Sequence, residues 1–159
     1  KINIPTSMRS IGEYAFRRCQ SLERIEIPEN VKSVGTHMFS ECSNLQEVIL
    51  NAKIKEIGQM FFSNCVSLLH IQLPKALVSI ANEAFLNCSS LTFISIPENV
   101  NSIGKLAFSG CTALSQVEMN SDKIKIDIGA FYLCPKIQPE MIKNLEKHHG
   151  TSITSIVSL

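Results

Sequence analysis

Six cysteines are the residues of this sequence with the most reactive side chains, and their spacing is regular. Five intervals of 23 residues separate Cys19, Cys42, Cys65, Cys88, Cys111 and Cys134. Thiols can form disulfides, bind a metal or act as nucleophiles, and free cysteine also fills protein cores as a small apolar residue. The choice among these depends on the elements that carry the cysteines.

The same 23-residue interval governs the apolar residues. A fixed period repeated in several columns is the signature of a repeat protein. One column holds Phe16, Phe39, Phe62, Phe85, Phe108 and Phe131. Two more hold Ile11, Val34, Ile57, Ile80, Ile103 and Ile126, and Leu22, Leu45, Leu68, Leu91, Leu114 and Ile137.

Two kinds of segment alternate within each period. LERIEIPEN, residues 22–30, alternates apolar and polar side chains as a half-buried strand does, and its proline ends the strand. LQEVILNAK, LLHIQLPKA, LTFISIPEN and LSQVEMNSD repeat the pattern, and KINIP at the start supplies a sixth strand. In IGEYAFRRCQSL, the apolar residues Ile11, Ala15, Cys19 and Leu22 have the spacing of one face of a short helix.

A coil made of one strand and one helical turn exposes apolar edges above and below. It is stable only when stacked on other coils, whose strands then pair in parallel about 4.8 Å apart. The sequence therefore predicts a solenoid in one structural unit.

In such a stack the cysteines point inward in parallel, and their spacing of about 4.8 Å exceeds the ~3.8 Å Cβ separation that a disulfide prefers. Paired metal ligands of the Cys-x-x-Cys type do not occur in the sequence. His37 lies five residues before Cys42, which is not the spacing of a shared helix face, so no nucleophile and base are indicated. We expect the cysteines to be free and buried.

One repeat, LTFISIPENVNSIGKLAFSGC from Leu91 to Cys111, resembles the 23-residue leucine-rich repeats of BspA-like surface proteins, and the resemblance covers residues 1–137. It implies an α/β fold: a right-handed solenoid with a parallel sheet on its concave face and short helical turns on its convex face. It also implies a cell-surface or secreted protein that adheres to host matrix or to other cells.

The sequence departs from the repeat pattern at a few positions. Asn51 and Asn120 replace the strand-ending proline, and we interpret these replacements as cosmetic, that is, without structural consequence. Ala81 replaces a glycine, so the glycines at 12, 35, 58 and 104 are expected to serve close packing and not a positive φ.

The pattern also stops at both ends of the chain. After the solenoid of residues 1–137, the segment 138–159 is expected to hold a C-terminal capping helix over 138–150, followed by a strand or tail. The chain begins within a repeat, so we interpret it as a piece of a longer protein. Its first coil would leave a sheet edge open, which allows end-to-end contact with another molecule.

Composition excludes several functions. Fifteen basic and 14 acidic residues, with no basic block, give no reason to expect a nucleic-acid partner. Apolar runs are too short for membrane insertion. No catalytic motif, cofactor loop or metal-ligand cluster occurs, so we predict a protein that is not an enzyme and has no cofactor or metal.

Binding is predicted where the scaffold repeats but the side chains vary. The strand residues that face away from the core form two columns on the concave face, with a third at its margin. These are Arg24, Glu47, His70, Phe93 and Gln116; Glu26, Ile49, Gln72, Ser95 and Glu118; and Glu23, Gln46, Leu69, Thr92 and Ser115. Ile49, Leu69 and Phe93 are expected to form an apolar patch with a charged rim, the plan of a protein interface.

The sequence thus favours a module that binds a protein, glycan or matrix ligand through this face. A spacer that holds another domain away from a surface is the alternative.

Overall fold

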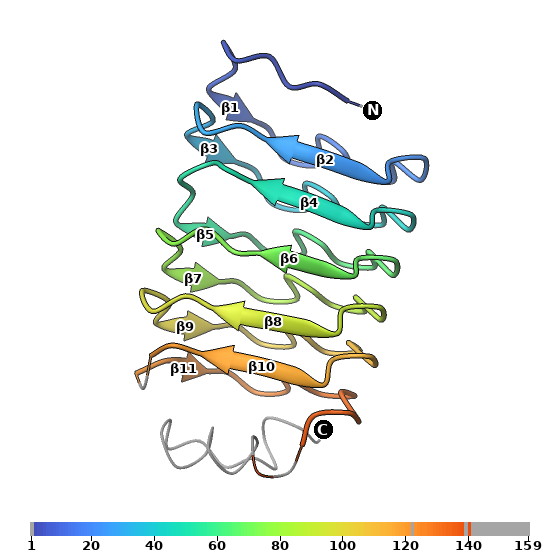
Figure 1. The fold of residues 1–159 in the computed structure, drawn as a ribbon, viewed down its shortest axis with the longest axis vertical. Helices are drawn as coiled ribbons and strands as arrows, with labels where there is room; N and C mark the ends of the chain where they lie inside the picture. The colour runs from blue at the N-terminus through green and yellow to red at the C-terminus, as the bar shows by residue number, and fades with distance from the viewer. Residues whose placement is uncertain (1, 122, 139, 141–159) are drawn as a thin grey trace.

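The protein is a stack of coils wound about one long axis, which is vertical in Figure 1. The computed structural model describes residues 2–121, 123–138 and 140. Each coil carries a longer strand on one side and a short strand on the other, joined by turns (Figure 1). The predicted solenoid of parallel strands is confirmed.

The longer strands are those that the sequence predicts from period-2 alternation. They are β2 (Arg24–Ile27), β4 (Glu47–Leu50), β6 (His70–Gln72), β8 (Phe93–Ile96) and β10 (Gln116–Met119). Side chains alternate between buried and exposed or half-buried positions along these strands, except that Met119 at the end of β10 is only partly buried. β2, β4 and β6 pair in parallel, as do β8 and β10, so the ladder is interrupted between β6 and β8.

A second set of strands, each two residues long, lies on the opposite side of the stack and was not predicted. They are β1 (Ser10–Ile11), β3 (Ser33–Val34), β5 (Glu56–Ile57), β7 (Ser79–Ile80), β9 (Ser102–Ile103) and β11 (Lys125–Ile126). β1 pairs with β3, and β5, β7, β9 and β11 form one parallel sheet. Two residues are too few to display an alternating pattern, which explains why these strands could not be predicted.

The predicted helical turns are wrong. Across residues 2–121 and 123–138 the secondary structure consists of strands and turns, so this part of the chain is a β-solenoid and not an α/β fold. Two residues of each coil have a positive φ, which an α-helix does not accommodate. The two columns are Tyr14, His37, Met60, Glu83, Leu106 and Gly129, and Arg18, Glu41, Asn64, Asn87, Gly110 and Leu133.

Hydrogen bonds between coils replace those of a helix. The amides of Phe39, Phe62 and Phe85 donate to carbonyls of the next coil at 2.9, 2.7 and 2.7 Å. Other amides close short turns, as Cys42 does by donating to the carbonyl of Phe39 at 3.1 Å. Each left-handed residue redirects the backbone toward the neighbouring coil, so the strain of a positive φ is offset by satisfied backbone groups.

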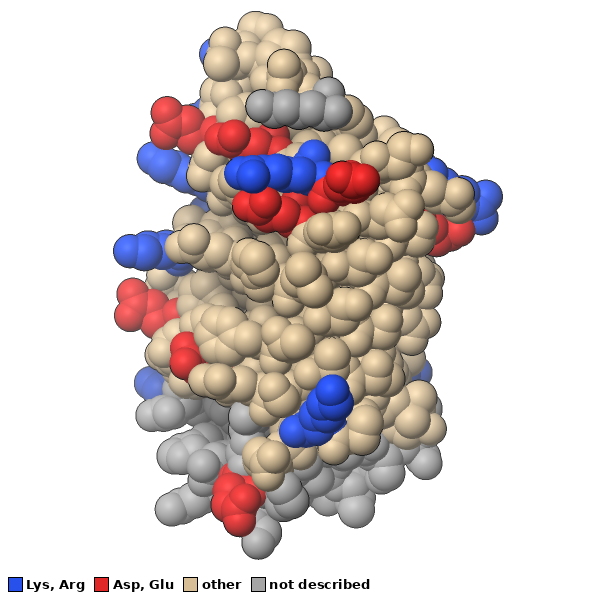
Figure 2. Space-filling model, turned by 45° about the vertical axis from the view of Figure 1, so that its right-hand side comes forward, with Lys and Arg blue, Asp and Glu red and all other residues tan. Residues whose placement is uncertain are grey.

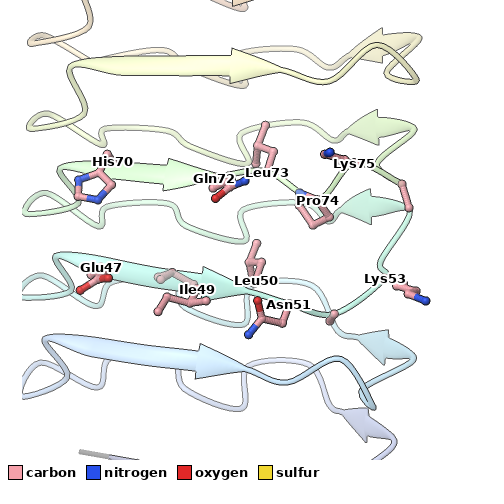
Figure 3. Close-up of a pocket in the computed structure, with 13 residues that line it drawn as sticks. Glu47, Ile49, Leu50, Asn51, Lys53, His70, Gln72, Leu73, Pro74 and Lys75 are labelled. Atoms are coloured by element: carbon pink, nitrogen blue, oxygen red, sulfur yellow. The ribbon is translucent and has the colours of Figure 1, made fainter.

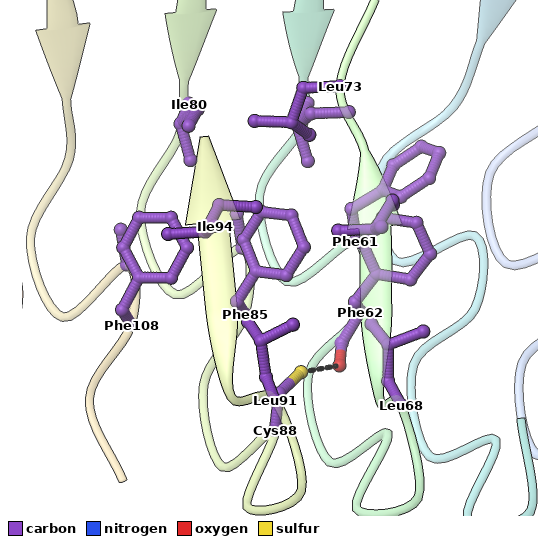
Figure 4. Packing of buried hydrophobic residues seen from close by; sticks show 14 of the residues in the cluster. Phe61, Phe62, Leu68, Leu73, Ile80, Phe85, Cys88, Leu91, Ile94 and Phe108 are labelled. Carbon is purple, nitrogen blue, oxygen red and sulfur yellow. Dashed lines mark hydrogen bonds between the residues drawn. The ribbon is translucent and has the colours of Figure 1, made fainter. Parts of the chain in front are cut away.

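The core is built on a column of phenylalanine rings. Consecutive rings from Phe16 to Phe131 stack with centroid distances of 5.0–5.4 Å and interplanar angles of 2–24°. Figure 4 shows Phe62, Phe85 and Phe108 side by side, with Leu68 and Leu91 on their flank. Phe61 adds a ring that meets Phe62 edge to face at 4.8 Å. The three apolar columns predicted from the period are confirmed as the core, except that Phe16 and Val34 are only partly buried.

Glycines in the repeat serve close packing, as expected from Ala81. A Cβ built on Gly104 would lie 2.6 Å from the backbone nitrogen of Asn82 in the preceding coil, whereas one on Gly12 meets nothing within 4 Å. The backbones of neighbouring coils therefore approach closely at Gly104 but not at Gly12, and the absence of a side chain at Gly104 permits this approach.

The ends of the chain differ from the prediction in one respect. Residues 2–5 form no strand, so the sixth long strand, KINIP, is wrong. Pro28, at the end of β2, has no N–H with which to bind the carbonyl of Ile4, and Ile4 is only partly buried against the core. The capping helix of 138–150 and the tail of 151–159 lie outside the described residues, apart from positions 138 and 140.

Candidate functional site

The cysteine thiols are part of the core. Five of them each donate a hydrogen bond of 2.9–3.2 Å to the carbonyl of a phenylalanine in the preceding coil. Figure 4 shows this bond from Cys88 to Phe62. All six are free, five are buried, and Cys19 is half-buried. The expectation of buried, unpaired thiols is confirmed for these five, and Cys19 of the first coil is the exception.

Burial also makes these thiols poor nucleophiles. It raises the pKa of Cys42 to about 11 and that of Cys134 to about 12, and it raises the pKa values of Cys65 and Cys88 as well. A thiolate is the reactive form, so a raised pKa and a closed core both oppose chemistry at these positions. Within the described ranges, no three Cys, His, Asp or Glu side chains are grouped as metal ligands.

The variable residues predicted to bind a ligand lie together on the outward side of the longer strands, a surface that we call the strand face. Its members are Arg24, Glu26, Glu47, Ile49, Leu69, His70, Gln72, Phe93, Ser95, Gln116 and Glu118, and all are exposed or half-buried. The parallel register aligns them in the predicted columns: Arg24 pairs with Glu47, Ile49 with Gln72, and Phe93 with Gln116.

The three apolar residues of the strand face do not fall in one column. Ile49 on β4 and Phe93 on β8 are separated by β6, whose outward residues are His70 and Gln72. Leu69 precedes β6 in the marginal column and is 48% exposed, whereas Ile49 and Phe93 are half-buried. The register therefore places polar side chains between the apolar ones.

Charge gathers at the ends of the strand face. Arg24 forms an ion pair of 3.1 Å with Glu47, and Glu26 accepts a hydrogen bond from Asn51 at 2.7 Å. At the other end, Gln116 donates to Glu118 at 3.2 Å. Figure 2 shows acidic and basic side chains near the upper end of the stack and a broad uncharged area below them.

The residue that ends each longer strand decides how tightly neighbouring coils join. Asn51 donates its backbone N–H to the carbonyl of Ile27 at 3.0 Å, and Asn120 donates to the carbonyl of Ile96 at 3.3 Å. Each asparagine thus extends a ladder of four paired residues, β2 with β4 and β8 with β10. The side chain of Asn120 adds bonds of 3.3 Å to Ser95 and 3.1 Å to the carbonyl of Ile96.

Proline at the same position has the opposite effect. Pro74 and Pro97 have no N–H, so neither can bind the equivalent carbonyl, Leu50 or Leu73. The β4–β6 ladder is three residues long, and β6 and β8 form no ladder. The interpretation of Asn51 and Asn120 as cosmetic is therefore wrong, because a backbone donor is gained wherever asparagine replaces proline.

Two adjoining grooves lie between the coils that Pro74 and Pro97 join less tightly. One, of about 480 Å³, runs between β4 and β6, and the other, of about 730 Å³, runs between β6 and β8. Figure 3 shows the first, with Ile49 and Gln72 in its middle, Glu47 and His70 near one end and Lys53 and Lys75 at the other. The residues that line both grooves are His70, Gln72, Leu73 and Lys75.

Comparison with known proteins identifies the repeat. The family model of the BspA type leucine rich repeat region matches residues 1–90 and 78–155, with six copies. The chain belongs to the BspA-type leucine-rich repeat family. A comparison with curated proteins found no match.

Solved structures of bacterial leucine-rich repeat proteins are similar to this chain. A leucine-rich repeat protein from Bacteroides ovatus aligns with a TM-score of 0.74 and 36% identity over 81% of this chain and 33% of that one. A leucine rich cell surface protein from Faecalibacterium prausnitzii aligns with a TM-score of 0.70 and 36% identity over 73% and 31%. The chain thus spans about a third of the length of these two proteins.

A third neighbour supports the fold alone. The leucine-rich repeat protein of T. pallidum aligns with a TM-score of 0.71 at 23% identity, over 95% of this chain and 80% of that one.

Several groove residues of this BspA-type solenoid were missed by reasoning from the sequence. They are Lys53, Lys75, Pro97, Glu98 and Asn120, which follow the ends of the strands. The prediction considered strand residues only, although the prolines and asparagines that end the strands were visible in the repeat pattern. No helix in the described part of the chain has the length and apolar character needed to span a membrane.

Proposed function

We propose that this chain is a non-enzymatic binding module that holds a macromolecular ligand, a protein or matrix component at a cell surface, on its strand face. The supporting observation is that one backbone geometry presents a different outward side chain on every coil. Repeat proteins of the leucine-rich type are scaffolds, and a neighbour that shares 36% identity is named a cell surface protein. The surface location and the adhesive role are part of this proposal.

Phe93 is the residue expected to lie at the centre of the proposed interface. Strand alternation buries Ile94 and Ile96 and turns Phe93 outward, where it is half-buried and lines the groove between β6 and β8. An aromatic ring on this side contributes nothing to the stacked phenylalanine core. Aromatic residues near the middle of an interface often contribute about 2 kcal/mol or more to binding.

The proposal is tested with Phe93→Ala. Binding to a panel of immobilised extracellular-matrix proteins, measured by biolayer interferometry, should weaken at least tenfold, or about 1.4 kcal/mol. Ile128→Ala is the matched control, because Ile128 is 47% exposed but lies outside the strand face. Thermal stability should hardly change in either variant.

Reversal of a charge at the edge of the strand face distinguishes electrostatic attraction of the ligand from the contacts that hold it once bound. Glu118→Lys should change the association rate and its dependence on salt more than the dissociation rate. If Phe93→Ala and Ile128→Ala bind alike, the strand face is not the interface, and the chain is better described as a spacer in a larger surface protein.

A further inference from the structure

The two grooves on either side of β6 form one continuous surface. They share His70, Gln72, Leu73 and Lys75, so that a ligand lying across β4, β6 and β8 would occupy both. The geometry points to a binding site for a neutral oligosaccharide, with successive sugar rings on successive coils. This inference rests on the proposed function, because it assigns a ligand class to the strand face.

The two coil steps that end in Pro74 and Pro97 lack one backbone donor each. By equivalence with the Asn51–Ile27 and Asn120–Ile96 bonds, the carbonyls of Leu50 and Leu73, two residues that line the grooves, receive no N–H from these prolines. Among the lining residues, Gln72 and Asn120 are exposed and offer amides that donate as well as accept. Sugar hydroxyls both donate and accept, so they match this mixture of groups.

An aromatic wall complements the polar groups. Phe93 is half-buried beside Ser95 on β8, and Ile49 occupies the other side of β6 on β4. The C–H face of a pyranose ring is apolar and packs on aromatic and aliphatic side chains. One half-buried apolar group on each side of a polar strand therefore suits a chain of rings.

The repeat distance favours sugar over peptide. Parallel coils are about 4.8 Å apart, which is close to the length of one pyranose ring in a β-linked chain, whereas an extended peptide advances about 3.3 Å per residue. A sugar chain that lies along the solenoid axis stays in step with the coils, and a peptide does not.

Charge is balanced around the site. The negative charges of Glu47 and Glu98 are balanced in number by the positive charges of Lys53 and Lys75, and all four residues lie at the ends of the strands. The outward residues between them are Ile49, His70, Gln72, Phe93 and Ser95, none of which is an Asp, Glu, Lys or Arg. A strongly acidic or basic ligand would find no complementary field here.

The test uses substitutions that the solenoid already contains. Pro97→Asn supplies the N–H that Asn120 and Asn51 supply elsewhere, so it should favour pairing of β8 with β6 and narrow the groove between them. Binding of neutral cello-, chito- and galacto-oligosaccharides is measured by isothermal titration calorimetry, with a sulfated oligosaccharide and an extended-peptide library as comparison ligands. Pro28→Asn is the matched control, because it adds the same group at a step outside the two grooves.

We expect saturable binding of one neutral oligosaccharide class, unchanged by Pro28→Asn and at least tenfold weaker in Pro97→Asn. Gln72→Ala, which removes an exposed amide without altering the backbone, should weaken binding as well and covers the case in which Pro97→Asn does not fold. Binding of the sulfated sugar or peptides alone would overturn the inference, as would equal affinity in all three variants.

A second measurement separates this inference from the proposed function. Wild-type protein is bound to a matrix glycoprotein before and after enzymatic removal of its glycans. Binding that disappears with the glycans supports the oligosaccharide site. Binding that survives their removal and still depends on Phe93 refutes it while the proposed function stands, and the absence of any binding through the strand face refutes both.

Discussion

Replacement of Phe85 by alanine tests the phenylalanine column as the spine of the solenoid. The ring is fully buried and stacks on Phe62 at 5.2 Å and on Phe108 at 5.0 Å. Truncation of a buried phenylalanine leaves a cavity and costs about 3–5 kcal/mol. The two ring contacts are of a kind worth about 0.5–1.5 kcal/mol each. The upper half of the 3–5 kcal/mol range is therefore expected.

The matched control is Phe16→Ala at the first ring of the column. Phe16 is half-buried and stacks on one ring, Phe39, so the same truncation should cost roughly half as much or less. Both variants are unfolded in urea, and the free energy of unfolding is compared with that of the wild type. A loss below about 1 kcal/mol for Phe85→Ala, or equal losses at both positions, would refute the column as the main source of stability.

Three further predictions concern the thiols and the glycines. Ellman's reagent should titrate all the thiols of the unfolded chain but react readily with only the half-buried Cys19 in the native protein, since the others are buried. Burial raises the pKa of Cys42 from 9.0 to about 11, so the thiol of the unfolded chain loses its proton at lower pH than the thiol of the folded protein. The free energy of unfolding should therefore fall as the pH rises from about 9 to about 11. A free energy of unfolding that does not change over this pH range would contradict the prediction. Gly104→Ala should cost about 1–3 kcal/mol, because its Cβ would lie 2.5 Å from Asn82 Oδ1, whereas Gly12→Ala should be nearly neutral in the same urea titration, and equal effects would argue against close packing.

The stacked architecture could be predicted because stacking imposes its period on the sequence. Each coil must bury the same positions, so the columns of Phe85, Leu91 and Ile80 recur every 23 residues. Strand alternation then oriented each outward residue, and Phe93 lies where that alternation placed it. These features depend on local patterns that a single sequence contains.

The helical turns could not be distinguished from the true turns by spacing. Ile11, Ala15, Cys19 and Leu22 fit a helix face, but the structure has a succession of tight turns here. The equivalent residues of a later coil, Ile57, Phe61, Cys65 and Leu68, are buried, whereas Ala15 itself is exposed. The left-handed residues that form these turns vary widely in type, from Tyr14 to Gly129, because hydrogen bonds to the next coil stabilise them. A backbone requirement met by tertiary contacts leaves no compositional signal.

The candidate site was predicted in part for a similar reason. Outward strand residues follow from alternation, but the effect of Pro74 and Pro97 depends on which carbonyl each strand-ending amide meets one coil earlier. That register emerges only from bonds such as Asn51 to Ile27 at 3.0 Å. Knowledge of the fold was therefore needed before a proline in the repeat could be recognised as an opening in the sheet.

The choice between proline and asparagine also explains how a regular solenoid acquires a local site. The phenylalanine and leucine columns run through successive coils, so a groove that arose from a different packing of these columns would cost stability. At the Pro74 step, replacement of one backbone donor by proline accompanies a ladder that is one residue shorter, and the energetic consequence of the lost donor is about that of one hydrogen bond, ~0.5–1.5 kcal/mol. The two consecutive proline steps around β6, between the asparagine steps at Asn51 and Asn120, thus open the strand face while leaving the phenylalanine column intact.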